Sequence, residues 1–264
     1  MHIDLSGRIA VVSGSTAGIG LAIATGLARA GAAVVINGRT EARVQAAAEA
    51  VRAAAPGADV RPVAADLATV AGAQALTESA PEADILINNV GTGEFKAFPD
   101  ITDEDWRALI DLNLMSGVRL SRHYLPQMVE RGWGRIVFIS SESGVNVPKE
   151  MIHYGVTKVA QLAVSRGLAE SVAGTGVTVN SVLPGPTRSE GVSAFLTAAA
   201  QAGGKSLEEA EGDFLTAFRP TSLLGRFATT EEVANMVVYV SSPQAAATSG
   251  AALRVDGGVV RFIA

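Results

Sequence analysis

The amino-acid sequence predicts an α/β fold, with a doubly wound parallel sheet of about seven strands and helices on both faces. Short aliphatic runs alternate with longer Ala- and Leu-rich stretches along nearly all 264 residues. Strand–helix–strand repetition requires right-handed crossovers, which make the sheet parallel and cover both of its faces. Hydrophobic residues form 48% of the chain and aromatic residues only 5%, so we expect an aliphatic core typical of buried parallel strands.

Seven runs have the composition of buried strands. In chain order they are Arg8–Ser13, Ala33–Asn37, Val60–Ala64, Ile85–Asn89, Arg135–Ser140, Val177–Leu183 and Ala252–Val255. Stretches with charges at helical spacing are Glu41–Ala54, Glu104–Glu130, Met151–Val172 and Glu231–Val240. Thr40 and Thr230 each precede an acidic residue, and we expect them to cap the helices that follow.

No linker, repeat or charge block divides the chain, so we expect a single domain over residues 1–264. The segment 186–220 interrupts the alternation and contains Gly203-Gly204 and scattered phenylalanines. A structureless loop of that length is unusual in a compact domain. We therefore expect helix within this segment and a role for it as a lid.

Charge and composition exclude several classes of protein. The net charge of −5 disfavours nucleic-acid binding, which requires a basic surface. The chain has no cysteine, and His2, His123 and His153 lack metal-ligand spacing, so we expect no metal site. The N-terminal residues lack the features of a secretory signal, and no run reaches the ~18 apolar residues of a membrane span. We expect a cytoplasmic protein that does not bind membranes.

A glycine-rich segment, Ser13-Gly14-Ser15-Thr16-Ala17-Gly18-Ile19-Gly20, follows the first predicted strand and leads into a helical stretch. In a Rossmann-type fold, a tight turn here presents the helix N-terminus to the pyrophosphate of a dinucleotide. Gly14 would permit the turn, Gly18 the approach of the phosphates, and Gly20 the packing of helix on strand. An ordinary turn is the alternative, but the position between first strand and first helix favours the cofactor.

The second predicted strand is followed by Gly38 and Arg39, with no acidic residue before Glu41. NAD-binding chains usually place an acid here, where it bonds the ribose hydroxyls. Arg39 instead offers a guanidinium group to a 2′-phosphate. A solvated arginine at a helix entrance is the alternative. Because an acidic residue is absent here and an arginine is present, we favour NADP(H) as the cofactor.

Tyr154 and Lys158 are four residues apart at the start of a predicted helix, so their side chains share one face. Tyrosine has an ordinary pKa near 10, and a neighbouring ammonium group together with the positive charge of oxidised nicotinamide would stabilise the phenolate and lower this pKa. Ser141 ends the fifth predicted strand, at the edge where parallel sheets bind ligands. A hydrolase is the competing use of this serine, but no G-x-S-x-G turn surrounds it. A Tyr–Lys pair without a role on a helix surface is the other alternative.

Together these residues resemble the compact branch of the short-chain dehydrogenase/reductase family, over essentially the whole chain. Asn88-Asn89-Val90-Gly91 is similar to the family's Asn-Asn-Ala-Gly segment, and Asp256-Gly257-Gly258 to its C-terminal turn. Asp66-Leu67 corresponds to residues that border the adenine, and Pro184-Gly185-Pro186-Thr187 to the turn that holds the nicotinamide carboxamide. Asn113 falls where the family places a helix asparagine.

The resemblance implies a role for each matching residue. Tyr154 would donate a proton to the carbonyl oxygen, Ser141 would orient that oxygen, and Lys158 would hold the nicotinamide ribose and lower the tyrosine pKa. Asn113 would fix a helix kink and a water linked to Lys158. The implied cofactor-binding residues are Gly14, Ser15, Thr16, Gly18, Ile19, Gly20, Arg39, Asp66, Leu67, Asn88, Asn89, Gly91, Tyr154, Lys158, Pro184, Gly185 and Thr187. The resemblance also implies a homotetramer or homodimer.

The predicted activity is NADP(H)-dependent interconversion of a carbonyl and a secondary alcohol, as in carbonyl or 3-oxoacyl reductases. An NAD-dependent alcohol dehydrogenase and a non-catalytic NADP-binding sensor are the alternatives. Phe195, Leu196, Phe214 and Phe218 in the predicted lid favour an apolar small-molecule substrate, unless they pack on the domain itself. Steroids, sugars, diketones and fatty acyl thioesters are all compatible with the sequence.

Overall fold

The structure, a computed structural model, describes residues 2–263 apart from the Phe195 side chain. Within this range, seven parallel strands form one sheet in the order β3-β2-β1-β4-β5-β6-β7. Their bounds are β1 Ile9–Val12, β2 Ala33–Gly38, β3 Val60–Ala64, β4 Ile85–Asn88, β5 Gly134–Ile139, β6 Val177–Pro184 and β7 Ala252–Val255. The strand order reverses between β1 and β4, where sheets of this kind bind ligands. The predicted fold class is confirmed.

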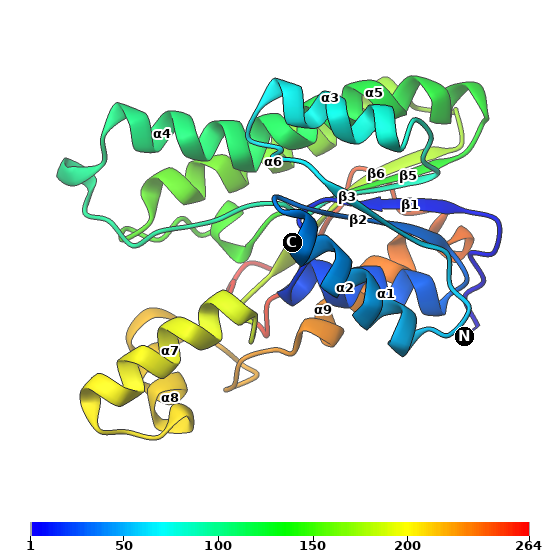
Figure 1. The fold of residues 1–264 in the computed structure, drawn as a ribbon. Coiled ribbons are helices and arrows are strands. Elements are labelled where there is room, and N and C mark those ends of the chain that lie inside the picture. Colours follow the sequence, from blue (N-terminus) through cyan, green and yellow to red (C-terminus); the bar gives the residue numbers. More distant parts are fainter. Residues whose placement is uncertain (1, 264) are drawn as a thin grey trace.

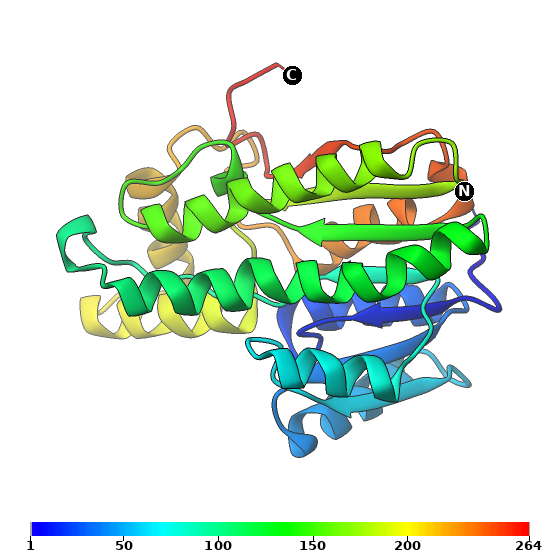
Figure 2. The same cartoon turned by 90° about the horizontal axis from the view of Figure 1, so that it is seen from above.

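Helices cover both faces of the sheet (Figure 1). One face carries α1 Gly18–Arg29, α2 Glu41–Ala54 and α9 Thr230–Val240; the other carries α3 Val70–Ser79, α4 Asp103–Leu109, α5 Ser116–Glu130 and α6 Ile152–Ser171. A π-helical turn, η2 Ile110–Met115, joins α4 to α5. Beyond the carboxyl ends of the strands lie α7 Glu190–Gly203 and α8 Leu207–Phe218 (Figure 2). The expected helix within residues 186–220 is thus confirmed, while the lid role stays a prediction.

Several predicted helix details differ from the structure. Thr229, and not Thr230, caps α9, because its side chain accepts a hydrogen bond from the Glu232 amide while Glu232 bonds back to the Thr229 amide. Thr40 is the N-cap of α2 but makes no capping hydrogen bond with its side chain. Helix α3 was not predicted, since its ten residues carry one charge and a glycine and show no clear charged face.

The aliphatic core is split into two layers by the sheet. Alternate strand residues face opposite sides: Val12 and Ile36 pack with α1, α2 and α9, whereas Val11 and Val35 pack with α3 and α5. All four side chains are essentially inaccessible to solvent. Because both faces are buried, the strands read as continuous aliphatic runs, and the sheet is a rigid base for the residues at its carboxyl edge.

Asn37, near the end of β2, joins the glycine-rich segment to two strands. Its side-chain oxygen accepts a hydrogen bond from the Gly14 amide at 3.2 Å, and its Nδ2 donates to the carbonyls of Val63 and Ala65. Its backbone amide donates to the Ser15 hydroxyl at 3.0 Å. Asn37 is 1% exposed. Its buried amide group therefore satisfies three backbone groups, of which the Ala65 carbonyl is fully buried and the other two are partly buried.

We expect Asn37→Ala to lower the free energy of unfolding by at least about 2 kcal/mol, because it leaves buried polar groups without partners. Urea denaturation measures this loss. Asn235→Ala, at an exposed position of α9, is the control and should change stability by less than about 0.5 kcal/mol. Equal stability of the two variants would show that Asn37 does not hold the segment.

Candidate active site

The turn from β1 into α1 accepts only glycine at three positions. Gly14 and Gly18 have positive φ angles of 61° and 54°. A Cβ added to Gly14 would lie 2.9 Å from Val90 Cα, and one added to Gly20 would lie 2.4 Å from the Gly14 carbonyl oxygen. Ala17, the N-cap of α1, offers no side-chain hydrogen bond to the first amides of the helix. The turn thus forms a narrow cradle whose helix N-terminus suits a phosphate group.

The residues after β4 fasten this cradle to the sheet. Asn89 Nδ2 donates to the Ser13 and Gly14 carbonyls at 2.9 and 3.0 Å. The Ser13 hydroxyl in turn accepts hydrogen bonds from the amides of Asn89 and Val90. Asn88, by contrast, is buried beneath the site and donates to the Ser121 hydroxyl. Asn89 therefore shapes the cradle directly, and Asn88 supports it from below.

The other predicted cofactor-binding residues divide into exposed and buried groups. Arg39 and Asp66 are exposed, whereas Ser15, Leu67, Pro184 and Thr187 are buried. Ser15 donates its hydroxyl hydrogen to the Val12 carbonyl, so its side chain serves the turn itself. Thr16 packs on Gly38, where an added Cβ would lie 2.4 Å from Thr16 Cγ2. Thr16 and Arg39 are thereby brought to the same part of the cradle.

The Pro184-Gly185 turn lies against the C-terminal Asp256-Gly257-Gly258 turn. A Cβ on Gly185 would lie 2.6 Å from the Asp256 carbonyl oxygen, so this contact also requires glycine. The Asp256 carboxylate accepts hydrogen bonds from the amides of Gly258 and Val260. On the opposite side, Gly18 faces Ser189, the N-cap of α7. The start of α7 and the C-terminal turn thus border the same edge of the sheet.

Asn113 lies in the π-helical turn η2 and is 1% exposed. Its side chain bonds to both backbone groups of Thr92: Oδ1 accepts from the amide at 2.9 Å, and Nδ2 donates to the carbonyl at 2.8 Å. The side-chain amide of Gln161 donates to the Asn113 backbone carbonyl at 2.5 Å. The predicted kink at Asn113 is therefore present as a π turn. Its carbonyl accepts from Gln161, and the expected water linked to Lys158 stays a prediction.

Lys158 is buried and held by two oxygens. Its Nζ donates to the Ile139 carbonyl at 2.9 Å and to Gln161 Oε1 at 3.2 Å. Gly91 approaches the same group, since an added Cβ would lie 3.5 Å from Lys158 Nζ and 3.2 Å from Asn113 Oδ1. Burial lowers the pKa of Lys158 to about 7. Its ammonium form is therefore only marginally favoured at neutral pH.

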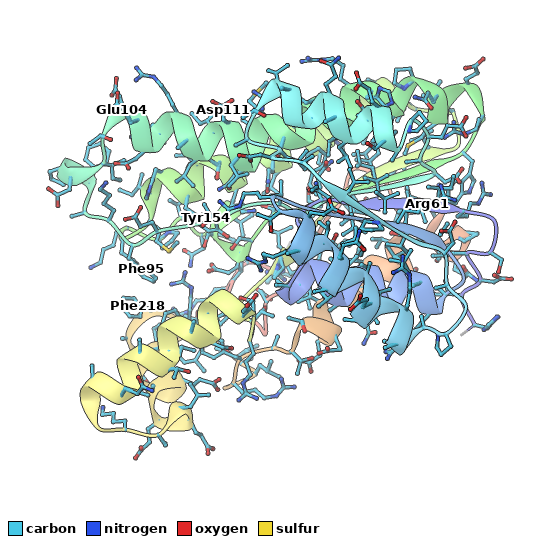
Figure 3. All side chains as sticks on the ribbon, in the orientation of Figure 1. Arg61, Phe95, Glu104, Asp111, Tyr154 and Phe218 are labelled. Carbon is cyan, nitrogen blue, oxygen red and sulfur yellow. The ribbon has the colours of Figure 1, made fainter. Side chains whose placement is uncertain are left out.

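Tyr154 lies half-buried in the first turn of α6 (Figure 3). Lys158 Nζ is 5.5 Å from the centre of the Tyr154 ring. A Cβ on Gly93, in the loop after β4, would lie 2.9 Å from Tyr154 Cδ2. Ser141 lies two residues after the end of β5 and interacts with the Tyr154 side chain. The structure thus brings Asn113, Ser141, Tyr154 and Lys158 together at the carboxyl edge of the sheet.

Lys158 does not lower the Tyr154 pKa within the chain itself, and the expected lowering by oxidised nicotinamide stays a prediction. Burial raises the pKa of Tyr154 to about 12, against a smaller lowering by the hydrogen bond with Ser141. The Lys158 ammonium group does not offset this, because it is directed at the Ile139 and Gln161 oxygens. At neutral pH Tyr154 therefore carries its proton.

Sequence reasoning missed two buried polar residues at the site, Gln161 and Glu142. Gln161 lies three residues after Lys158 on α6, and Glu142 directly follows Ser141. Glu142 is 3% exposed and forms a salt bridge of 2.8 Å with Arg219, which follows α8. Adjacency to the predicted catalytic residues was the only available sequence signal. No pattern marks Arg219, which is distant along the chain.

Two further properties follow from the described part of the chain. Among residues 2–263, no cluster of three or more His, Asp or Glu side chains has the arrangement of a metal site. None of the described helices has both the length and the apolar character needed to cross a bilayer.

The doubly wound sheet, glycine cradle and Ser–Tyr–Lys group define an oxidoreductase that acts on carbonyl or alcohol groups with a dinucleotide. Residues 8–199 match the family model of the short chain dehydrogenases. The chain therefore belongs to the short-chain dehydrogenase/reductase family.

Three relatives illustrate this membership. The uncharacterized oxidoreductase YvaG of Bacillus subtilis is 45% identical over 263 residues, which cover 100% of both chains. The 3-oxoacyl-acyl-carrier-protein reductase FabG of Aquifex aeolicus is 32% identical, covering 98% of this chain and 100% of the relative. The crystal structure of L-sorbose reductase from Gluconobacter frateurii, complexed with NADPH and L-sorbose, is 34% identical, covers 100% of both chains and gives a TM-score of 0.94.

Buried Lys158 should make stability depend on pH. Its pKa of about 7 in the folded chain is below the ordinary 10.5, so between these values the unfolded chain binds more protons and stability rises with pH. We expect Lys158→Met to be more stable than the wild type near pH 7, with an advantage that shrinks toward pH 10. Urea denaturation across this range measures the difference. Lys149→Met, at an exposed position, should show no such trend, and a pH-independent difference for Lys158→Met would contradict the desolvation of Lys158.

Proposed function

We propose that this protein is an NADP(H)-dependent reductase that interconverts a small-molecule carbonyl compound and a secondary alcohol, with Tyr154 as the general acid and base. The observation that carries the proposal is the convergence of Ser141, Tyr154 and Lys158 beside the glycine cradle, at the switch point of the sheet. Tyr154 is protonated at neutral pH, which is the form that donates a proton to a carbonyl oxygen.

The residues present fit a dinucleotide. A side chain at Gly14 or Gly20 would clash with Val90 or the Gly14 carbonyl and so distort the tight turn, and the N-terminus of α1, which no side chain caps, suits a pyrophosphate. When bound, the nicotinamide supplies the hydride. Ser141 holds the carbonyl oxygen near the Tyr154 hydroxyl, Tyr154 donates the proton, and Lys158 is positioned to bond the nicotinamide ribose. Asn113 and Gln161 keep Lys158 in place through the hydrogen bonds that connect them.

The preference for NADP(H) rests on Arg39. Its side chain is exposed directly after β2, beside Thr16 of the cradle, and no acidic residue takes the place that would bond ribose hydroxyls. The related L-sorbose reductase was crystallised with NADPH, which supports the same preference here. The NAD-dependent alcohol dehydrogenase is the rival that this site distinguishes.

The remaining expectations stay predictions. Among them, a homotetramer or homodimer is supported by Val156 and Val159, two apolar residues on the outer side of α6 that are each 42% exposed.

The predicted lid is a helical pair with its own small core, in which Leu196 and Leu215 pack against Phe227. Leu196 and Phe214 belong to this core, so only Phe218 among the described lid aromatics supports an apolar substrate.

We expect Tyr154→Phe to reduce NADPH-dependent turnover by about 10²- to 10⁴-fold, because it removes the proton donor. The measurement is loss of NADPH absorbance with a panel of ketones, hydroxyketones and 3-oxoacyl thioesters. Tyr239→Phe, on α9, is the control and should retain full activity. NADPH binding, followed by fluorescence, should persist in both variants. Binding without turnover in the wild type would instead identify a non-catalytic NADP-binding sensor.

Arg39→Leu should weaken NADPH binding roughly 10- to 150-fold, the factor for a lost charged hydrogen bond, and leave NADH binding within about twofold. Arg43→Leu is the matched control: this arginine lies one turn further on α2 and is 3.4 Å from Glu190. Titration of each variant with both cofactors measures the effect. An equal loss for NADPH and NADH in Arg39→Leu would contradict the phosphate role.

A further inference from the structure

The two carboxylate oxygens of Glu142 differ in their hydrogen bonds. Oε1 accepts hydrogen bonds from Arg219 Nε at 2.8 Å and from the Ser143 hydroxyl at 3.1 Å. Oε2 is buried and has no hydrogen-bond partner among the described residues. A buried carboxylate oxygen without a donor is destabilising, and native structures rarely leave one so. Oε2 can therefore accept a hydrogen bond from a donor outside the chain.

Glu142 lies beside the reacting groups. It begins the short helix η3 (Glu142–Gly144), which Ser141 caps with its side chain. Gly144, in the same turn, is packed so closely on α6 that an added Cβ would lie 3.1 Å from the Lys158 carbonyl oxygen. The charges of Glu142 and Arg219 shift the pKa of Tyr154 in opposite directions, as expected if both lie near its hydroxyl group. Glu142 is thus buried beside Ser141 and close to Tyr154.

The surrounding charges select the kind of donor. Arg219 also approaches Glu150, with Nη1 at 3.5 Å from Oε1, so two carboxylates share one guanidinium group. This excess of negative charge disfavours phosphate and carboxylate groups. A cationic group of a substrate would lie close to the Arg219 guanidinium group, which is bonded to Oε1, and would be repelled by it. A neutral hydroxyl group satisfies Oε2 without either conflict.

Two aromatic side chains meet next to Arg219. Phe218, directly before Arg219, faces Phe95 from the loop after β4, with ring centres 5.6 Å apart (Figure 3). Arg219 and Phe218 thus connect the end of α8 to both walls of the site. A substrate hydroxyl group would give Oε2 a donor, whereas an acyl chain would leave it without one, so the difference favours substrates that carry a hydroxyl group.

We propose that Glu142 Oε2 accepts a hydrogen bond from a hydroxyl group of the substrate, and that the substrate is a hydroxylated ketone of the sugar or polyol class. The proposal rests on the proposed reductase function. In the reaction, the carbonyl carbon gains a hydride from NADPH and the carbonyl oxygen gains a proton from Tyr154, giving a secondary alcohol and NADP⁺. Glu142 takes no part in this transfer and determines which ketone is accepted.

The wild-type protein provides the first test. We expect kcat/KM for ketohexoses or 1-hydroxybutan-2-one to exceed that for hexan-2-one, butan-2-one and a 3-oxoacyl thioester by about 10²-fold or more. Equal or better reduction of the ketones without hydroxyl groups overturns the proposal but leaves the reductase function intact. Absence of NADPH oxidation with every carbonyl overturns the reductase function itself, so the two failures are distinguishable.

Glu142→Gln tests the residue. Its amide oxygen can keep the bond to Arg219, while its NH₂ group replaces the acceptor Oε2 with a donor. We expect kcat/KM for 1-hydroxybutan-2-one to fall about 10- to 100-fold, chiefly through KM, and that for butan-2-one to change less than about threefold. An equal change for both ketones overturns the proposal.

Glu211→Gln is the matched control, because Glu211 forms a comparable salt bridge with Arg188 at the α7–α8 pair, 2.7 Å long. It should leave the ratio between the two ketones unchanged. Thermal denaturation of both variants establishes that they fold. If Glu142→Gln fails to fold, the wild-type preference decides alone.

Discussion

The buried ammonium group of Lys158 constrains the half of the candidate site that contains Tyr154. A charge removed from water needs fixed oxygens around it, and the chain supplies the Ile139 carbonyl at the end of β5 and Oε1 of Gln161. Gln161 can provide that oxygen only if its NH₂ group has another partner, since an amide has one accepting and one donating end. The Asn113 carbonyl is this partner, and the π turn leaves it free to accept. One hydrogen-bonded chain therefore joins β5, α6 and η2.

The cofactor half of the site depends on close backbone approach. Gly14, Gly18 and Gly20 leave no room for side chains, so the cradle gains little from packing its own residues. Two asparagines compensate for this: Asn37 ties the turn to β2 and β3, and Asn89 ties it to β4. Both are at the carboxyl ends of strands beside the switch point. Because β1 lies between β2 and β4 in the sheet, the two asparagine amides lie on either side of β1.

The sequence predicted the strands to within about a residue at most ends because alternation between aliphatic runs and helical stretches is a local signal. Tyr154 and Lys158 were recognisable for the same reason, since four residues define one helix face. The π turn was not predicted, because Ile110–Met115 has the composition of ordinary helix and its extra residue is fixed by tertiary contacts. Arg219 and Glu142 are 77 residues apart, and only folding brings them together. The pKa of Tyr154 also depends on burial, which no spacing encodes.

Burial also bears on the protonation states of Tyr154 and Lys158. It raises the pKa of Tyr154 to about 12 and lowers that of Lys158 to about 7, so desolvation favours the neutral form of each group. A neutral tyrosine is ready to donate a proton, as carbonyl reduction requires, whereas alcohol oxidation requires the phenolate. Formation of the phenolate costs more in this site than in water, by about 1.4 kcal/mol for each unit of pKa. The burial that orders Lys158 therefore leaves Tyr154 in its proton-donating form, so any step that requires the phenolate needs a further charge to stabilise it.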